Sequence, residues 1–294
     1  MGIRALIGRN LKRFFRDRTA VVLSLLSVII MVILYAAFLT DVQVKNVSGE
    51  LMRRAQTEVA RKDALFFVNT WLIAGIMVVC VVNTTLSSAQ NFVRDVENGV
   101  SKDIMLTPMA KPKLVASYML SNAIISFLIT FAVFIVAQIY IVAAGGKIMS
   151  FVNILYSIGI ILLCVFSFSC MVGYLVTFLK STTAFTAICT AVGVLIGFFA
   201  GIYLPMGMFP EALRNILNLL PFTAAAMLFR IPFMSDSTGA IFLNDTVQNS
   251  LITEYGLNVT AYGYTFPTWL CVVYLIAIGA LFFMLSIFRI SKKI

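Results

Sequence analysis

The charged residues that are best placed to act together in this chain lie in one polar segment, residues 87–113. Arg94, Asp95 and Glu97 stand close together there, and Gly99 follows them. Carboxylates in such an arrangement can form ion pairs with basic residues of another protein, and a glycine permits a turn or a close backbone approach. The apolar residues of the segment recur in part at intervals of three or four, which predicts a short amphipathic helix. A plain solvated loop is the alternative.

Motifs for catalysis, nucleotide binding and metal binding are not evident in the sequence. The phosphate-binding motif GxxxxGK[ST] is not present at the only Gly-Lys pair, Gly146-Lys147, because Ile141 stands where the motif needs its first glycine. The chain has no histidine, and its five cysteines lie inside apolar stretches without a CxxC pair. We therefore expect no catalytic, cofactor-binding or metal-binding residues here. An intramembrane enzyme without a known motif is the alternative.

The elements that must position the charged segment are six long apolar stretches, none of which contains an ionisable residue. At a rise of about 1.5 Å per residue, a helix of 20 residues crosses a hydrocarbon core of about 30 Å. With 61% hydrophobic and 12% charged residues, the composition predicts an all-α polytopic membrane protein with one transmembrane domain over residues 1–294. The stretches are 20–39, 64–86, 114–144, 151–179, 183–204 and 266–288.

The absence of charge in these stretches also bears on the mechanism. Proton relays and charge-coupled transporters usually need ionisable groups at membrane depth. The sequence therefore favours a source of energy outside the six stretches.

Basic residues predict the orientation of the chain. Six of the 22 Lys and Arg residues precede the first stretch, where Asp17 is the only acid. The positive-inside rule places this N-terminus in the cytoplasm, and six spans return the C-terminus to the same side. Residues 40–63 are expected outside, although they carry five basic and four acidic residues. We expect the protein to lie in the cytoplasmic membrane of a prokaryote. We also expect the first span to be retained, because its apolar run is longer than that of a typical cleaved signal peptide.

Residues 1–18 predict an amphipathic helix that lies flat at the membrane surface. Its apolar residues recur at helical spacing, while Arg4, Lys12 and Arg16 can reach lipid headgroups. A basic flank that only sets the topology is the alternative.

Glycines at intervals of four mark the fifth stretch. Gly193, Gly197 and Gly201 form a double GxxxG pattern, which lets another helix approach closely. The neighbouring helix can belong to the same chain or to a second copy, and the spacing does not decide between them.

Residues 205–265 predict an outer re-entrant and polar loop. Two apolar helical pieces, 211–220 and 222–228, are each too short to span a membrane, which is typical of re-entrant or interfacial helices. Glu211 and Arg214 are three residues apart and can pair on one face. The residues that follow, 231–265, are expected to be a polar outer loop.

Taken in order, these features resemble the membrane subunit of ABC transporters of the type-2 exporter class. The resemblance covers essentially the whole length, and residues 87–113 resemble the coupling helix of that family. Val100 departs from the pattern, since the family often has threonine there. The residues that match are Asp95, Glu97, Gly99, Leu106, Thr107 and Pro108 in the coupling loop, beside Arg94, and Pro205, Pro210, Pro221 and Arg230 in the outer re-entrant helices.

The resemblance implies a transport subunit without catalytic activity of its own. It implies two permease subunits, as a homodimer or a related heterodimer, that work with two cytoplasmic ATPase subunits by alternating access. ATP and magnesium would then bind the ATPase, no cofactor would bind this chain, and no nucleic acid is expected. We expect export of an amphiphilic small molecule, drug or peptide. The alternatives are export of a polysaccharide or lipid-linked glycan, a scaffold for an ATPase that transports nothing, and an energy-independent channel.

Overall fold

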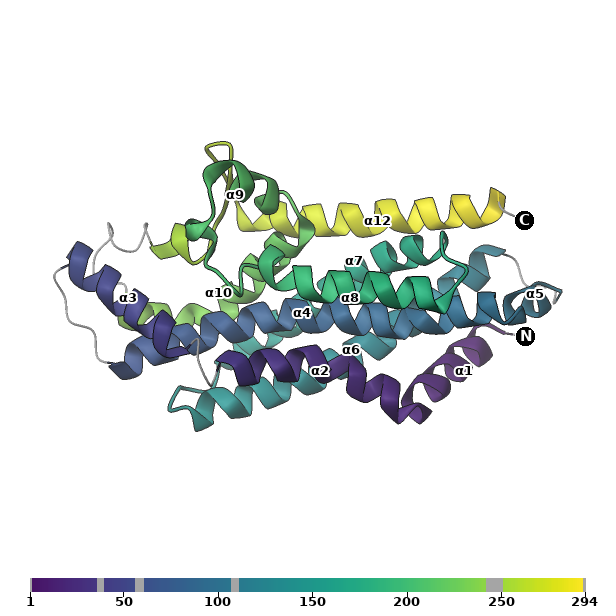
Figure 1. Cartoon of the computed structure of the whole chain (residues 1–294), viewed down its shortest axis with the longest axis horizontal. Coiled ribbons are helices and arrows are strands. Elements are labelled where there is room, and N and C mark those ends of the chain that lie inside the picture. The colour runs from purple at the N-terminus through teal and green to yellow at the C-terminus, as the bar shows by residue number, and fades with distance from the viewer. Residues whose placement is uncertain (1, 36–39, 56–60, 107–110, 242–250, 293–294) are drawn as a thin grey trace.

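Helices make up most of the chain in the computed structural model, which describes residues 2–35, 40–55, 61–106, 111–241 and 251–292 (Figure 1). One short antiparallel hairpin accompanies them among these residues. The elements are α1 (Ile3–Arg16), α2 (Arg18–Leu34), α3 (Thr40–Ala55), α4 (Arg61–Glu97), α5 (Val100–Met105), α6 (Lys111–Ala143), α7 (Phe151–Val176), α8 (Thr182–Phe199), η2 (Met206–Met208), α9 (Glu211–Asn218), α10 (Pro221–Ile241), β1 (Val259–Ala261), β2 (Tyr264–Phe266) and α12 (Thr268–Lys292).

The long helices form an elongated bundle with two different ends. Both termini and α5 lie at one end of the long axis, and α3 lies at the opposite end (Figure 1). We call the first of these the coupling end. The expectation that the termini share a side with residues 87–113 therefore agrees with the arrangement of the helices.

Helix α4 is the centre of the bundle. It packs against α2, α3, α6, α7, α8 and α10. In the most apolar 18 residues of α4, 89% of the residues are buried, whereas in α8 the share is 17%. A helix surrounded by other helices can carry small hydroxyl residues, which find partners in protein rather than lipid. Thr84 donates to Cys80 O of its own helix at 2.8 Å and lies 3.5 Å from the Thr130 hydroxyl of α6. The segment at residues 87–113 therefore begins on the most enclosed helix.

Five of the six predicted spans are confirmed as helices that are long and apolar enough to cross a membrane: α4, α6, α7, α8 and α12. The first predicted span, 20–39, corresponds to α2, of which Ser24–Leu34 is a shorter apolar helix. Residues 36–39 lie outside the described residues. A sixth candidate arises when α9 and α10 are taken together as one span, which is bent by 81°.

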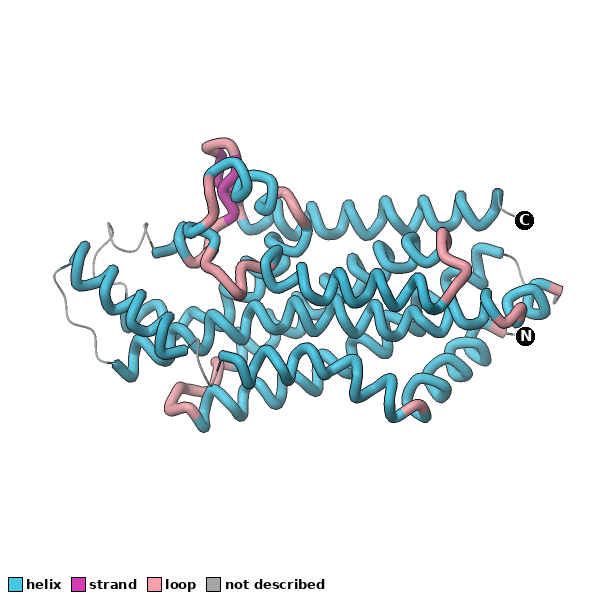
Figure 2. Tube along the Cα trace, in the orientation of Figure 1, coloured by secondary structure: helices cyan, strands magenta, loops and turns pink. Residues whose placement is uncertain are grey.

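The outer segment differs from the sequence prediction. The short helix predicted at 222–228 is longer in the structure. It belongs to α10, which has 21 residues and continues through Pro232 to Ile241. Consequently the predicted polar loop at 231–265 begins inside a helix. It ends in the hairpin, where Val259 pairs with Phe266 (Figure 2). The sequence also gave no sign that residues 40–63 contain α3.

Candidate functional site: the coupling end

A sharp turn joins α4 to α5 at the coupling end. Helix α4 does not stop at residue 86 but continues to Glu97, and the N–H of Gly99 donates to Val96 O at 3.2 Å. Gly99 has a φ of +77°, which side-chain-bearing residues rarely adopt. A Cβ there would meet nothing within 4 Å. Gly99 is therefore required for the turn and not for a close approach within this chain.

The predicted amphipathic helix in residues 87–113 is divided by this turn. Its first part belongs to the 37-residue helix α4, and its second part, α5, has six residues. The expectation of one separate short helix is wrong, because α4 continues from the span as far as Glu97 and the chain then turns at Gly99.

Asp95 is the centre of a buried ion-pair cluster. Arg9 and Arg13 of α1 form ion pairs with its two carboxylate oxygens. The hydroxyl of Tyr118 on α6 donates to Asp95 Oδ2 at 2.6 Å, and Arg9 donates to the same hydroxyl at 3.0 Å. The Asp95 side chain is 0% exposed, whereas those of Arg9 and Arg13 are 29% and 32% exposed. One carboxylate therefore joins α1, α4 and α6.

This geometry corrects the hypothesis that Asp95 pairs with basic residues of a partner protein. A fully buried carboxylate whose two oxygens are both bound has no surface to offer to another protein. Asp95 acts within the chain, where it fixes α1 to the end of α4.

Helix α1 is an amphipathic helix, as predicted, but its buried face meets protein. Leu6, Asn10 and Phe14 recur at intervals of four and are buried. The Asn10 amide donates to the hydroxyl of Ser121 on α6 at 3.0 Å. Phe14 packs against Ile125, which also lies on α6. A buried asparagine among the apolar positions indicates a protein contact, because lipid chains offer no hydrogen-bond partner.

Sequence reasoning missed the roles of Arg9, Arg13 and Tyr118. A usable signal was present for the arginines. They are four residues apart, so they share one face of α1, next to the face that Asn10 occupies. No pattern in the sequence points to Tyr118, since its partner is 23 residues away along the chain.

Glu97 joins the end of α4 to the start of α8. Its Oε2 accepts hydrogen bonds from the hydroxyl and the backbone N–H of Thr182, at 2.6 and 3.3 Å. The first N–H groups of a helix lack intrahelical partners, and a carboxylate there also interacts favourably with the helix dipole. Ser181, the N-cap residue of α8, makes no side-chain capping bond of its own. Glu97 is exposed, so a partner protein can still reach it.

The remaining predicted coupling residues are more peripheral. Arg94 lies 3.9 Å from Asp17, and both side chains are partly exposed, so this pair contributes little to stability. Leu106 is 87% exposed, which places an apolar side chain on the surface of the coupling end. Thr107 and Pro108 lie outside the described residues.

Comparison with known proteins gives one positive finding. The family described as "ABC-2 type transporter" matches residues 1–234, which is more than half of the chain. The chain belongs to the ABC-2 type transporter family. No curated protein matches it. It is thus a multi-pass permease of an ABC transporter, a kind of transport subunit that is generally not catalytic, and its family implies association with ABC ATPase subunits.

In this ABC-2 permease the glycines of the fifth span have neighbours in the same chain. A Cβ on Gly193 would lie 3.7 Å from Asn83 Oδ1 of α4, and one on Gly197 would collide with the Tyr203 ring. Gly201 lies beyond the end of α8, with a φ of +61°, and closes the helix through a hydrogen bond from the next residue to Gly197 O at 2.9 Å. The prediction of three glycines on one helix face is therefore wrong at Gly201. Self-association stays a prediction.

Prolines delimit the outer helices of the permease, as expected. Pro210 precedes α9, Pro221 is the first residue of α10, and Pro205 is buried before η2. The predicted pair of Glu211 and Arg214 does not form: these two described residues share no ion pair.

Arg230 holds this outer segment together. It is 0% exposed and donates to Gly256 O at 2.9 Å, Ala200 O at 2.9 Å and Gly201 O at 3.1 Å. Its guanidinium lies 5.5 Å from the centre of the Trp71 ring on α4. No described carboxylate lies within ion-pair distance. The charge is thus held by carbonyls at the end of α8 and before β1, and by the π face of an indole.

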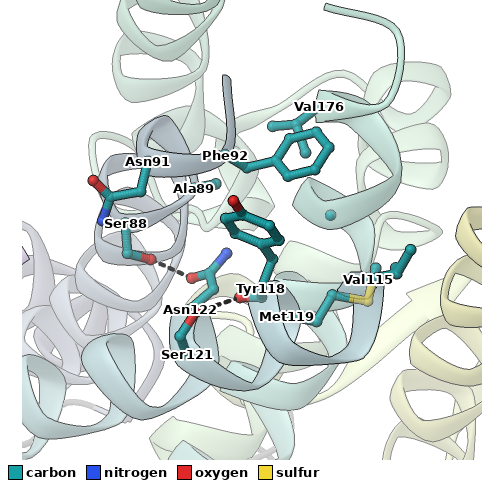
Figure 3. Close-up of a pocket in the computed structure, with 11 residues that line it drawn as sticks. Ser88, Ala89, Asn91, Phe92, Val115, Tyr118, Met119, Ser121, Asn122 and Val176 are labelled. Atoms are coloured by element: carbon teal, nitrogen blue, oxygen red, sulfur yellow. Dashed lines mark hydrogen bonds between the residues drawn. The ribbon is translucent and has the colours of Figure 1, made fainter. Parts of the chain in front are cut away.

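Two cavities of different character adjoin α4. One, near the coupling end, has a volume of about 20 Å³ and polar lining groups, among which Ser88 donates to Asn122 (Figure 3). This volume suits about one water molecule. The other has about 300 Å³ and is almost wholly apolar. Its aromatic lining residues are Phe168, Tyr174, Phe178, Phe222 and Phe282.

Proposed function

We propose that this chain is the permease subunit of an ATP-driven exporter that moves an amphiphilic small molecule, drug or peptide by alternating access. The observation that carries the proposal is the continuity of α4. Its 37 residues run without a break from the α3 end of the bundle to the turn at Gly99, a length of about 55 Å. A displacement at the coupling end therefore acts on the central helix directly.

The aromatic cavity supports a hydrophobic or amphiphilic cargo. It lies among α4, α7, α8, α10 and α12, and polar atoms contribute almost nothing to its lining. A sugar chain needs hydrogen-bond partners as well as aromatic faces, because its hydroxyls lose water on binding. The aromatic residues keep a polysaccharide or lipid-linked glycan as the second candidate cargo.

Partners follow from two surfaces of the permease. We place the ATPase subunits, with their ATP and magnesium, at the coupling end, where Glu97 and Leu106 are exposed. We place a second permease copy on α8, the least buried of the candidate spans. Small residues there allow close helix approach, and the exposed ones at helical spacing are Thr183, Thr186, Ala187, Thr190 and Ala191. Native mass measurement of the purified chain is expected to show a dimer. A monomer alone would contradict this placement.

The orientation is tested by labelling single cysteines in a background without the five native ones. Tyr262 is 72% exposed in the hairpin, and Leu106 is 87% exposed at the coupling end. We expect Tyr262→Cys to react with an impermeant maleimide in intact cells and Leu106→Cys to react only after permeabilisation. The reverse pattern would place the coupling end outside.

Coupling is tested by reversing a charge at the turn. Glu97→Lys removes the acceptor that holds Thr182 and puts a positive charge at the start of α8, where the helix dipole disfavours it. Gly99→Val forces a β-branched residue to a φ of +77°. We expect the cargo moved per ATP hydrolysed to fall at least about fivefold for either variant.

The matched control for the charge reversal is Glu211→Lys, which changes the same charge in the first turn of another exposed helix start, α9. The cargo that this variant moves per ATP hydrolysed should stay at the wild-type value in proteoliposomes that contain the permease and its ATPase. Normal ratios for Glu97→Lys and Gly99→Val would show that the ATPase acts elsewhere.

A further inference from the structure

An apolar groove runs along one side of the bundle between α2 and α6, with α4 at its floor. Its volume is about 560 Å³. Val21 and Ile33 mark the two ends of the α2 wall. They are 12 residues apart in one helix, hence separated by about 18 Å, slightly more than the roughly 15 Å of one leaflet of the hydrocarbon core. The walls of the groove consist almost entirely of apolar side chains, for example those of Leu25, Ile29, Leu128 and Val136.

A basic cleft of about 370 Å³ lies at the C-terminal end of α1, just before α2 begins. Four basic side chains and one acid line it: Lys12, Arg13, Arg16, Asp17 and Arg94. Arg13 is held by Asp95, and Arg94 lies near Asp17. Lys12 and Arg16 are exposed and share no ion pair with a described carboxylate. The cleft therefore keeps two positive charges available for an anion.

Phe15 lies in sequence among the cleft residues of α1, whereas its own side chain lines the groove. It is 43% exposed and is the neighbour of Arg16 on α1. Lys12 lies three residues before Phe15, on an adjoining part of the same helix surface. Positive charge at the surface helix and hydrocarbon along the span thus follow each other in the order of a lipid headgroup and its acyl chain.

We propose that the cleft and the groove together bind one anionic phospholipid. The phosphate lies between Lys12 and Arg16, and one acyl chain lies in the groove between α2 and α6. A second copy of this chain is the competing occupant. A two-fold dimer through this face would bring two identical basic clefts together, and like charges disfavour that contact. An anionic lipid neutralises the cleft instead.

Native mass spectrometry of the purified full-length protein tests this assignment, with phosphatidylglycerol and phosphatidylcholine as probes. We expect the wild type to retain more phosphatidylglycerol than phosphatidylcholine. The double variant Lys12→Gln/Arg16→Gln should lose most of that preference, by about fivefold for each basic residue removed. Ala132→Phe, which narrows the groove from α6, should reduce the retention of both lipids.

Two matched controls separate the site from general effects. Lys113→Gln/Lys180→Gln removes two exposed charges outside the cleft, and Ala277→Phe adds a ring to an exposed position of α12. Both should retain lipid as the wild type does. An undiminished preference in Lys12→Gln/Arg16→Gln, or undiminished retention in Ala132→Phe, would overturn the proposal. Retention by no lipid at all, with dimers that Ala132→Phe separates, would assign the groove to a second copy.

Discussion

Asp95→Asn is expected to lower the stability of the permease by about 3 kcal/mol. The substitution removes the charge that binds Arg9 and Arg13 and leaves two arginines facing each other across a neutral amide. Breaking a buried pair costs more than breaking an exposed one, because the remaining group stays poorly solvated. Thermal unfolding in detergent should show a midpoint lower by roughly 5–10 °C. The N-terminal helix should also become more accessible to protease, since Asp95 is its anchor.

Asp103→Asn is the control for this prediction. It removes the same charge from an exposed position on α5, where a surface carboxylate contributes little. Its unfolding midpoint should match that of the wild type. Equal stability of Asp95→Asn and Asp103→Asn would show that the cluster does not hold α1.

Arg230→Met is expected to destabilise the outer segment by about 3 kcal/mol or more. The variant leaves three buried carbonyls, those of Gly256, Ala200 and Gly201, without their donor. Each unsatisfied buried acceptor costs about 1–3 kcal/mol. The variant also removes the cost of burying a charge, which acts in the opposite direction. Three lost acceptor bonds together with the lost contact to Trp71 should outweigh that gain.

Arg214→Met on α9 is the matched control, since this arginine is less buried and lacks such a set of carbonyl partners. Thermal unfolding should rank Arg230→Met well below Arg214→Met. An Arg230→Met protein as stable as the wild type would mean that the desolvation of the guanidinium cancels its hydrogen bonds.

The sequence predicted the spans well because their physical signal is local. Of the six uncharged stretches, five form helices at the expected place that are long enough to cross a bilayer. The signal failed where a charge interrupted an apolar run. The predicted piece 222–228 stopped before Arg230, yet α10 continues to Ile241, and protein carbonyls rather than water satisfy the buried guanidinium.

The sequence predicted where the candidate site lies, but it did not predict which residues its side chains contact. Asp95, Glu97 and Gly99 were found from residue types and spacing, and Gly99 does make the turn. Whether a carboxylate faces a partner protein or its own chain depends on neighbours far away in sequence. Asp95 meets Arg9 at a separation of 86 residues and Tyr118 at 23. The spacing of Arg9 and Arg13 shows that they share a face of α1, but it does not show which carboxylate they meet. Glu97 likewise meets Thr182, which is 85 residues away along the chain, because α8 packs against α4.

Export driven by ATP is tested most directly by measuring cargo flux in proteoliposomes, with and without the ATPase subunit, while ATP hydrolysis is recorded. A fluorescent amphiphile serves as the probe. We expect uphill movement of the probe only when both subunits and ATP are present, together with stimulation of ATP hydrolysis by the probe. Movement down its gradient through the permease alone would identify a channel. Hydrolysis that the probe leaves unchanged, without flux, would identify a scaffold, and either result would contradict an ATP-driven exporter.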